Sequence, residues 1–307
     1  MEPIFIGVDT GNRCIKTASN VFVAGVKVSE KEPAFKIDTL IYNNVYYTLT
    51  HDRVAYLQDK TESEEYFALT LFAIAKELEE REIDTEAVVP IKLGVGLPPS
   101  HLERLKDSFK EYFNRGVVSF EYKDKTIKID IRFVQVFSQA YAAIYKDFAK
   151  IRNFDEAYIV DIGGYTTDII ALHNGKVNPS VCRSIDMGLI QLYNKVSWKI
   201  HDTYGRNPSE SSIDRAMATH EEIAPTMPIL EIINDETTTY IAELLRKLAE
   251  FGVDLTFTKG IFVGGGSERF KPWIEKSEYV FEPYFITSIF ANAQGYEALL
   301  AALNPNK

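Results

Sequence analysis

The chain has 307 residues, of which 46% are apolar and 25% are charged, and its formal net charge is −10. This is the composition of a globular protein, so a disordered chain and a low-complexity chain are excluded. The acidic balance argues against a broad phosphate-binding surface, so we expect any contact with DNA to run through another protein. At roughly 150 residues per domain, the length predicts about two domains.

The sequence also sets expectations about the cellular compartment. No apolar run approaches the ~18 residues that a membrane span requires. A strand-like run begins at Ile4, with no basic leader or cleavage pattern before it. Cys14 and Cys182 lie far apart and form no CxxC motif. We therefore expect a reduced, cytoplasmic protein without disulfides, zinc or a membrane anchor.

In the first half of the chain, β-rich runs alternate with helical patterns. The hairpin signal Thr10-Gly11-Asn12 joins the first two expected strands. The expected strands are Ile4–Asp9, Arg13–Ala18, a weakly patterned region containing Thr39–Thr50 and Arg53–Gln58, then Val88–Leu97, Val117–Tyr122 and Thr126–Val136. The expected helices run from Thr61 or Ser63 to about Glu82, from about Ser100 to Asn114, and from about Ser138 to Lys150.

The second half restarts the alternation. The expected strands are Ala157–Asp161, Thr166–His173, Val181–Ile185, Thr258–Val263 and Tyr279–Phe281. The expected helices lie near Leu189–Tyr204, Ser209–Ala218, Glu236–Phe251, Glu268–Lys276 and Ser288–Leu303. Two alternating blocks of this kind predict an α/β protein whose sheets have covered faces.

Two segments, separated by about half of the chain, have similar sequences. The run Ile6–Asn12 and the run Tyr158–Gly164 each consist of an apolar strand, an Asp-x-Gly sequence and a tight turn before a second strand. The two aspartates, Asp9 and Asp161, are 152 residues apart. A duplicated domain would produce that spacing.

An Asp-x-Gly hairpin suits polyphosphate and magnesium. Glycine lets the backbone approach phosphate oxygens, and successive N–H groups in a turn can bind an anion. A carboxylate can hold the water shell of Mg²⁺. Lys16, seven residues after Asp9, could add a point charge to the β- and γ-phosphates. Each hairpin alone is also compatible with an ordinary turn. An aspartic protease, which also uses Asp-Thr-Gly, is disfavoured because Asp161 is followed by Ile-Gly-Gly-Tyr-Thr-Thr.

Two further features have competing interpretations. Gly264-Gly265-Gly266 follows an apolar strand and could let the backbone lie against a nucleotide, or it could be a flexible turn into a helix. No Lys follows these glycines, so they are not a Walker A loop. Gln139, expected at the start of a helix joining the two halves, could orient an attacking water or could be an ordinary surface glutamine.

Together these segments resemble the actin, heat-shock ATPase and sugar-kinase superfamily over nearly the whole chain. The five motifs are Gly7–Asn12 with Lys16, Phe137–Ala143, Val160–Asp168, Phe262–Gly266 and Ala291–Tyr296. Within the superfamily, the runs Gly94–Pro98 and Ala291–Tyr296 are similar to those of the bacterial ParM/StbA actin-like proteins of plasmid segregation.

The resemblance implies an actin-like ATPase fold, with two related domains of ribonuclease-H-like sheets and flanking helices around a nucleotide cleft. We expect a first domain over residues 1–150, with a small subdomain near 25–85. The second would cover 151–307, with a small subdomain near 188–255 and a C-terminal helix, 288–303, packing back on the first domain.

The resemblance also implies roles for individual residues. Asp9 and Asp161 would hold Mg²⁺ through water, and Gln139 would position the water that attacks ATP. The implied phosphate ligands are Thr10, Gly11, Asn12, Lys16, Gly163, Gly164, Tyr165 and Thr166. The implied adenosine ligands are Gly264, Gly265 and Gly266. The residues that would bind the base are not assigned, although Ser209–Glu222 is a candidate region, so GTP remains open beside ATP.

The implied function is that of an ATPase which polymerises with ATP·Mg²⁺ and loses its filament after hydrolysis. In the family, a small DNA-binding adaptor links the filament to a centromere-like plasmid site, so direct DNA binding is not expected. The alternative is a small-molecule kinase on the same fold, which needs a base near the γ-phosphate, commonly a carboxylate. The glutamine at position 139 is better suited to orienting water. A scaffold that binds nucleotide without hydrolysing it is a third reading.

Overall fold

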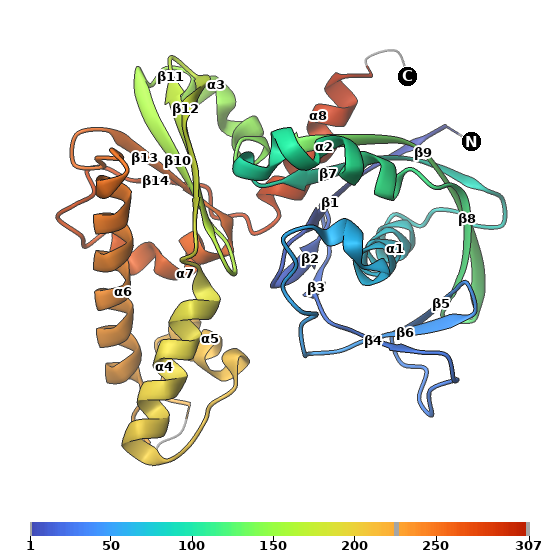
Figure 1. Ribbon diagram of the computed structural model, residues 1–307, viewed down its shortest axis with the longest axis horizontal. Coiled ribbons are helices and arrows are strands. Elements are labelled where there is room, and N and C mark those ends of the chain that lie inside the picture. Colours follow the sequence, from blue (N-terminus) through green and yellow to red (C-terminus); the bar gives the residue numbers. More distant parts are fainter. Residues whose placement is uncertain (1, 224–226, 305–307) are drawn as a thin grey trace. The chain divides into compact units, whose positions relative to one another are not determined.

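The computed structural model describes residues 2–223 and 227–304 of the chain (Figure 1). Contacts between residues divide the chain into two compact units. The first unit consists of Met1–Asp147 together with Phe290–Lys307, and the second unit consists of Phe148–Ile289. None of the described helices is long and apolar enough to cross a membrane.

The described strands of the first unit form one nine-stranded sheet in the order β3-β2-β1-β7-β9-β8-β5-β6-β4. Strands β1, β7 and β9 are parallel to one another, and the remaining neighbours are antiparallel. The strands are β1 (Ile4–Thr10), β2 (Cys14–Lys16), β3 (Val21–Val23), β4 (Val26–Ser29), β5 (Thr39–Tyr42), β6 (Val45–Leu49), β7 (Val89–Leu97), β8 (Gly116–Tyr122) and β9 (Lys125–Ser138).

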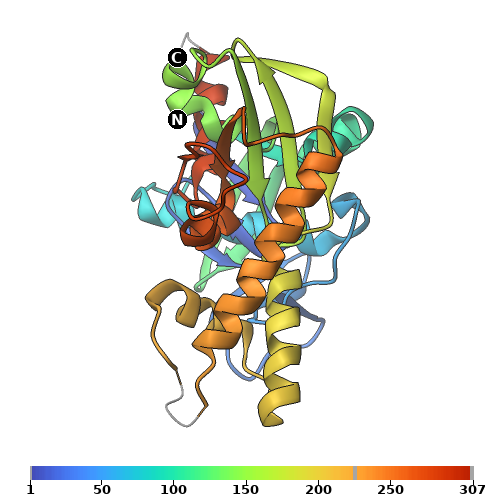
Figure 2. The same cartoon turned by 90° about the vertical axis from the view of Figure 1, so that its left-hand side faces the viewer.

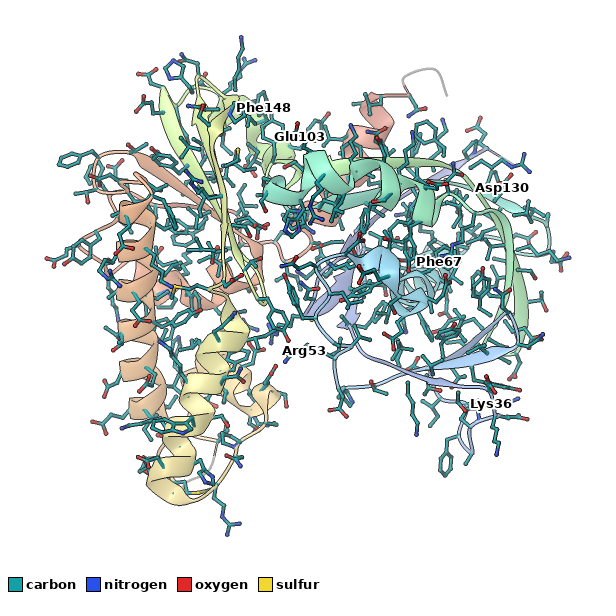
Figure 3. All side chains as sticks on the ribbon, in the orientation of Figure 1. Lys36, Arg53, Phe67, Glu103, Asp130 and Phe148 are labelled. Carbon is teal, nitrogen blue, oxygen red and sulfur yellow. The ribbon has the colours of Figure 1, made fainter. Side chains whose placement is uncertain are left out.

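The helices of the first unit cover this sheet. They are η1 (Lys60–Glu62), α1 (Glu64–Glu80), α2 (Pro99–Phe113), η2 (Ala142–Asp147) and α8 (Ala291–Ala302). Ser63 begins α1 as an N-cap, because its side chain accepts a hydrogen bond from the backbone N–H of Glu65. Helix α1 is buried over most of its length, and Phe67 on it lies in the interior of the unit (Figure 3). The first core therefore forms around α1 and the inner strands of the sheet.

The second unit has a five-stranded sheet in the order β12-β11-β10-β13-β14. Its strands are β10 (Glu156–Ile162), β11 (Thr167–His173), β12 (Lys176–Ile185), β13 (Lys259–Val263) and β14 (Tyr284–Phe285). Its helices are α3 (Phe148–Ile151), α4 (Leu189–Tyr204), α5 (Glu210–Thr219), α6 (Leu230–Glu250) and α7 (Gly264–Ile274). Figure 2 shows α4 and α6 side by side, and the two helices contact each other in the second core.

The two units repeat one topology. In each, a leading strand (β1 or β10) pairs with an antiparallel hairpin partner, which pairs with a third antiparallel strand. On its other side, the leading strand is followed by two parallel strands, β7 and β9 or β13 and β14. The two similar Asp-x-Gly segments therefore occupy the same topological position in both units. This confirms the prediction of two related α/β domains.

Helix α8 packs closely on β1 and β7 of the first unit. The close approach depends on glycine, because a Cβ on Gly7 would lie 2.0 Å from the carbonyl oxygen of Ala293. A Cβ on Gly96 would lie 1.9 Å from the hydroxyl oxygen of Tyr296, whose ring stacks on Phe137. The segments Gly94–Pro98 and Ala291–Tyr296 therefore pack against each other, with the glycines of the first facing Tyr296 of the second.

Three expected elements are wrong. Residues 53–58 are not a strand, and 279–281 form a turn and a bend, with the short strand β14 a few residues later. Residues 138–150 do not form one helix. They contain the end of β9, a turn, the 3₁₀ helix η2 and the beginning of α3. β-propensity depends strongly on the neighbours that a strand finds, which a local pattern does not contain.

Candidate functional site

The first Asp-x-Gly turn places a carboxylate and a cation on one face of the first sheet. Asp9 and Lys16 are directly opposite each other in the β1–β2 ladder, and opposite residues in such a ladder project to the same side. Lys16 Nζ lies 3.7 Å from Asp9 Oδ2, and Asp9 is only 5% exposed. The intervening turn residues, Gly11 and Asn12, are partly exposed, so the turn is accessible while its carboxylate is nearly enclosed.

Gln139 joins this group from the end of a different strand. It directly follows β9, and its backbone N–H donates to the carbonyl of Leu97 on the neighbouring strand β7. Its side-chain Nε2 lies 3.4 Å from Asp9 Oδ1. Parallel strands end at a common edge of a sheet, which brings Gln139 to Asp9 although 130 residues separate them.

Gln139 does not lie on a helix, contrary to the expectation. The next residue, Ala140, has φ +62° and is fully buried. This left-handed backbone conformation is costly for a residue with a Cβ and interrupts any helix. Asn292 at the start of α8 stabilises it, because Asn292 Oδ1 accepts a 3.0 Å hydrogen bond from the N–H of Ala140. The contact comes from the far end of the chain, so no local pattern around Ala140 could reveal it.

Side chains that the sequence did not single out also hold the first turn. Lys60 Nζ donates to the carbonyl oxygen of Thr10. The hydroxyl of Tyr66 donates a 3.2 Å hydrogen bond to Asn12 Oδ1. Thr10 is fully buried, and its hydroxyl oxygen makes no hydrogen bond within residues 2–223 and 227–304. Neither Lys60 nor Tyr66 stands in a recognisable motif, so their role is visible only in the folded unit.

The second turn, Gly163 to Thr166, is hydrogen-bonded to the N-terminal end of helix α4. Three of its carbonyl oxygens accept hydrogen bonds from residues of the first turn of α4. The pairs are Leu189 N to Gly163 O at 3.1 Å, Ile190 N to Gly164 O at 2.9 Å, and Gln191 Nε2 to Tyr165 O at 2.8 Å.

This anchoring orients the backbone of the second turn. The C=O and N–H of a trans peptide unit point in opposite directions. The N–H groups of Gly164, Tyr165 and Thr166 belong to the same peptide units as the three anchored carbonyls, so they face away from α4. Successive backbone N–H groups in a turn form a concavity suited to anions. The second turn can therefore accept phosphate oxygens on the side away from α4.

The triple glycine contacts the aspartate of the second turn. Helix α7 begins at Gly264, which has φ +86°, so the three glycines form the first helical turn rather than a flexible link before it. A Cβ on Gly264 would lie 2.2 Å from Asp161 Oδ1. Residue 264 must therefore be glycine for two reasons, its backbone conformation and the position of Asp161. The structure thus brings Asp161 and Gly264 together.

A second carboxylate lies beside Asp161. Asp168 is its direct partner in the β10–β11 ladder, and the two aspartates are 7% and 5% exposed. Like charges opposite each other in a ladder are unfavourable, and a bound cation would relieve that repulsion. Among the described residues there is no group of three or more His, Cys, Asp or Glu side chains that could hold a metal. The donors present fit Mg²⁺, which usually takes one or two carboxylates, keeps several waters and binds phosphates.

The predicted site residues thus gather in two groups, one in each unit. Asp9, Lys16 and Gln139 lie together at the first turn. Asp161 lies beside both the second turn and the triple glycine. The functional roles assigned to these residues remain predictions. The prediction from sequence did not include Lys60 and Tyr66 at the first turn or Gln191 at the second. Each of these side chains contacts its turn from a helix elsewhere in the sequence.

Two known families match the sequence, one in each half. The family described as actin like proteins N terminal domain matches residues 7–141. The family described as archaeal actin homologue MreB-like, C-terminal, matches residues 159–276. Both are actin-like, and together they span both turns. The chain is an actin-like protein.

Solved structures show the same fold for this actin-like protein. The archaeal actin homologue Ta0583 is 18% identical, with a TM-score of 0.78 over 97% of this chain and 99% of its own. ParM from a 15-stranded Clostridium botulinum filament is 17% identical, with a TM-score of 0.75 over 98% and 100%. Bacillus thuringiensis ParM, solved with ATP, is 13% identical, with a TM-score of 0.71 over 100% of both chains. No curated protein gives a significant match by sequence.

Proposed function

We propose that this actin-like protein is an ATPase that assembles into filaments when it binds ATP·Mg²⁺ and disassembles after hydrolysis. The observation that carries the proposal is the repeated turn. Each unit presents an aspartate and a glycine-containing turn at the same position of the same topology. A polyphosphate bound by both turns would be contacted by equivalent groups of both units. The similarity to Bacillus thuringiensis ParM, whose structure contains ATP, supports nucleotide as the ligand.

The residues divide the binding work as follows. Lys16 and the amides of the first turn bind phosphate oxygens, with Thr10, Gly11 and Asn12 forming that turn. On the second unit, the turn formed by Gly163, Gly164, Tyr165 and Thr166 binds phosphate through the N–H groups of its last three residues, and Gly264, Gly265 and Gly266 approach the adenosine. Asp9 and Asp161 hold Mg²⁺ through water. When bound, Mg²⁺ neutralises part of the phosphate charge and orients the phosphate chain.

Gln139 is the residue that we assign to hydrolysis. Its side-chain amide, 3.4 Å from Asp9 Oδ1, can hold a water by hydrogen bonds without removing its proton as a strong base would. A slow reaction follows from this arrangement, because positioning is the main contribution that the side chain makes. Slow hydrolysis suits a filament whose lifetime is set by its nucleotide.

Nucleotide state can control assembly if the terminal phosphate is held by both units. Loss of that phosphate removes a contact to each turn, and such a loss can be converted into a rigid-body domain movement. A head-to-tail contact between copies that does not close into a ring produces a filament. The structural similarity to ParM from the Clostridium botulinum filament supports assembly of this kind. We extend the proposal to plasmid segregation in the cytoplasm, through a small DNA-binding adaptor protein.

Purified protein tests the proposal directly. We expect light scattering to rise on addition of ATP and Mg²⁺, phosphate to be released more slowly, and scattering then to decay. Electron microscopy should show filaments with ATP and none without nucleotide, and GTP in parallel establishes the base preference. Turnover that depends on a small-molecule acceptor, without polymer, would instead identify a kinase. Nucleotide binding with neither polymer nor phosphate release would identify a scaffold.

A further inference from the structure

Two loops of the second unit expose three aromatic side chains on one surface, which we call the aromatic patch. Phe257, Tyr279 and Phe281 are 87%, 57% and 60% exposed. The two loops are joined, because the N–H of Phe281 donates a 2.9 Å hydrogen bond to the carbonyl oxygen of Leu255. The side chains of Leu255 and Val280 are buried and anchor the loops in the second unit. The aromatic rings are therefore exposed on loops that are fixed from within.

The aromatic patch borders two hollows of the second unit. One has a volume of about 720 Å³ and is lined by Phe257, Phe281 and Asp155, among others. The other has a volume of about 610 Å³ and lies between Tyr279 and the outer face of α6. Clustered exposed apolar side chains mark contacts with another protein, and aromatic residues are enriched at the centres of such contacts. The aromatic patch therefore has the shape and the chemistry of a docking surface.

The loops that carry the aromatic patch are acidic. Together, residues 251–258 and 275–283 contain four Asp or Glu residues and one Lys. Charges around an interface steer the partner and set its orientation when the two surfaces are of opposite sign. The surface that docks on the aromatic patch should therefore combine an apolar centre with basic surroundings.

Helix α4 presents a surface of this kind. Trp198 is 67% exposed, although tryptophan is strongly buried on average. The opposite face of α4 packs in the second core through Val196 and Ile200, so Trp198 is not required there. Residues 194–207 contain three Lys or Arg residues and one Asp, in a chain whose net charge is −10. The Trp198 face of α4 thus matches the acidic surroundings of the aromatic patch.

Another exposed apolar segment of the chain matches the patch less well. Phe35 and Ile37 are both exposed on the loop between β4 and β5. Residues 29–38 of this loop contain three acidic and two basic residues, so its charge has the same sign as that of the aromatic patch. The charge pattern therefore favours the Trp198 face.

The two matching surfaces lie on different parts of one compact unit. The hydroxyl of Tyr204, at the end of α4, donates a 3.1 Å hydrogen bond to the carbonyl of Pro228, just before α6 begins. The aromatic patch comes after the other end of α6, which has 21 residues and is about 30 Å long. Figure 1 shows the end of α4 and the end of α6 at opposite ends of the second unit. Two different, complementary surfaces on one body permit a head-to-tail contact that repeats from copy to copy.

We propose that the Trp198 face of α4 in one copy docks on the aromatic patch of the next copy in the filament. This inference rests on the proposed filament assembly and deepens it by naming the two surfaces. The indole ring of Trp198 is buried among Phe257, Tyr279 and Phe281, and the basic residues of the α4 face lie beside the acidic loops. The contact is heterologous, so every copy in the filament uses both surfaces.

Purified variants test the contact. Trp198→Ser removes the apolar centre of one surface, and Phe257→Ser removes part of the other. Val117→Ser, at an exposed position of β8 in the first unit, is the control for loss of an exposed apolar side chain. Pelleting with Mg²⁺ and the non-hydrolysable β,γ-imido analogue of ATP gives the critical concentration for filaments. We expect a rise of about 10-fold or more for Trp198→Ser and for Phe257→Ser, the size of a central interface residue, and no change for Val117→Ser.

The same variants distinguish a lost contact from a damaged protein. The substituted side chains are exposed and lie outside both turns, so thermal unfolding without ligand and calorimetric nucleotide affinity should match the wild type. Filaments from either variant at the wild-type critical concentration would overturn the contact, while filament assembly itself stands. A wild-type protein that forms no filament with any nucleotide would overturn both proposals.

A mixture of the two variants tests the pairing of the surfaces. Trp198→Ser keeps an intact aromatic patch, and Phe257→Ser keeps an intact Trp198 face. An equimolar mixture should therefore form dimers that cannot grow, at concentrations where each variant alone is monomeric. Sedimentation velocity measures these species. A mixture that stays monomeric would show that the two surfaces do not bind each other.

Salt tests the charge complementarity. Added NaCl screens the attraction between the basic face of α4 and the acidic loops, so the critical concentration of the wild type should rise with ionic strength. A critical concentration that falls or stays constant as NaCl is raised would contradict the pairing of these two surfaces.

Discussion

Arg81 Nε donates a 2.7 Å hydrogen bond to Glu77 Oε2, one helical turn earlier, and Glu77 is only 1% exposed. The other oxygen of Glu77 accepts hydrogen bonds from the hydroxyls of Thr17 and Ser19, just after Lys16. Arg81 Nη2 also donates a 2.8 Å hydrogen bond to Glu297 Oε2 on α8. One buried carboxylate thus ties the segment that follows the first turn to α1 and, through Arg81, to α8.

Glu77→Gln should destabilise the first unit. Breaking a buried ion pair on one side leaves the other charge poorly compensated, which costs about 3–5 kcal/mol when both groups are buried. Because Arg81 is partly exposed and keeps Glu297, we expect a loss of about 2–3 kcal/mol in the free energy of unfolding. Urea denaturation measures it. Glu79→Gln on the same helix removes an exposed pair with Lys123 and should change stability by less than about 1 kcal/mol.

The same carboxylate predicts a pH dependence. Burial alone raises the pKa of Glu77, but the hydrogen bonds from Ser19, Thr17 and Arg81 bring the pKa below its ordinary value of 4.5. A carboxyl group with a lowered pKa in the folded state stabilises the fold above its unfolded pKa, and this stabilisation is lost as the pH falls through its folded pKa. The stability difference between the wild type and Glu77→Gln should therefore be constant at neutral pH and shrink below about pH 4.5. A difference independent of pH down to pH 3 would contradict this prediction.

Gly264→Ala should impair the second unit, and Gly265→Ala should not. Residue 264 has φ +86° and no room for a Cβ beside Asp161 Oδ1, whereas a Cβ on Gly265 meets nothing within 4 Å. Backbone strain at a position of this kind costs about 1–3 kcal/mol, and the clash must also displace the Asp161 side chain. We expect lower thermal stability, measured without ligand, for Gly264→Ala alone. Equal thermal stability of the two variants would exclude the Asp161 contact.

Gln191→Leu should loosen the second turn without unfolding α4. The side chain of Gln191 donates to Tyr165 O and accepts from the N–H of Gly188, so both contacts are lost together. The carbonyl of Tyr165 is then less strongly held, and the amides on the opposite side become less ordered. We expect nucleotide affinity to fall about 3- to 10-fold, the size of one modest hydrogen bond. Lys199→Ala, exposed on the same helix, is the control and should bind nucleotide like the wild type.

Asp161→Ala tests the catalytic half of the proposed function. We expect the variant to fold, because the pairing of position 161 with Asp168 in the β10–β11 ladder is made by the backbone. Hydrolysis should fall by at least about 10-fold because Mg²⁺ is no longer positioned. The Mg²⁺ dependence should weaken, and filaments should persist longer. Glu156→Ala, at the exposed start of the same strand, controls for loss of a carboxylate. Phosphate release at the normal rate from Asp161→Ala would show that the assigned role is wrong.

The two hairpins could be predicted because they are local. An apolar strand, an Asp-x-Gly turn and a second strand all lie within about a dozen residues, and each feature has its own residue signal. Asp9 and Asp161 are 152 residues apart, about half of the chain, and this separation predicted a duplicated domain. The two sheets share one topology, as a duplication would produce. Gln139 was found as a candidate by resemblance, but its helical setting was predicted wrongly. Asn292, 152 residues later, stabilises the left-handed Ala140 that prevents the helix.

The amino-acid sequence by itself determined the actin-like class, the repeated aspartate turns and the residue types that suit phosphate and Mg²⁺, because these depend on short segments and their order. Only the tertiary structure decided which distant side chains complete each turn. Lys60 and Tyr66 reach the first turn, and Gln191 reaches the second, through helices that pack against it. Such contacts arise from packing between segments far apart in the chain, which the propensities of the individual residues do not encode.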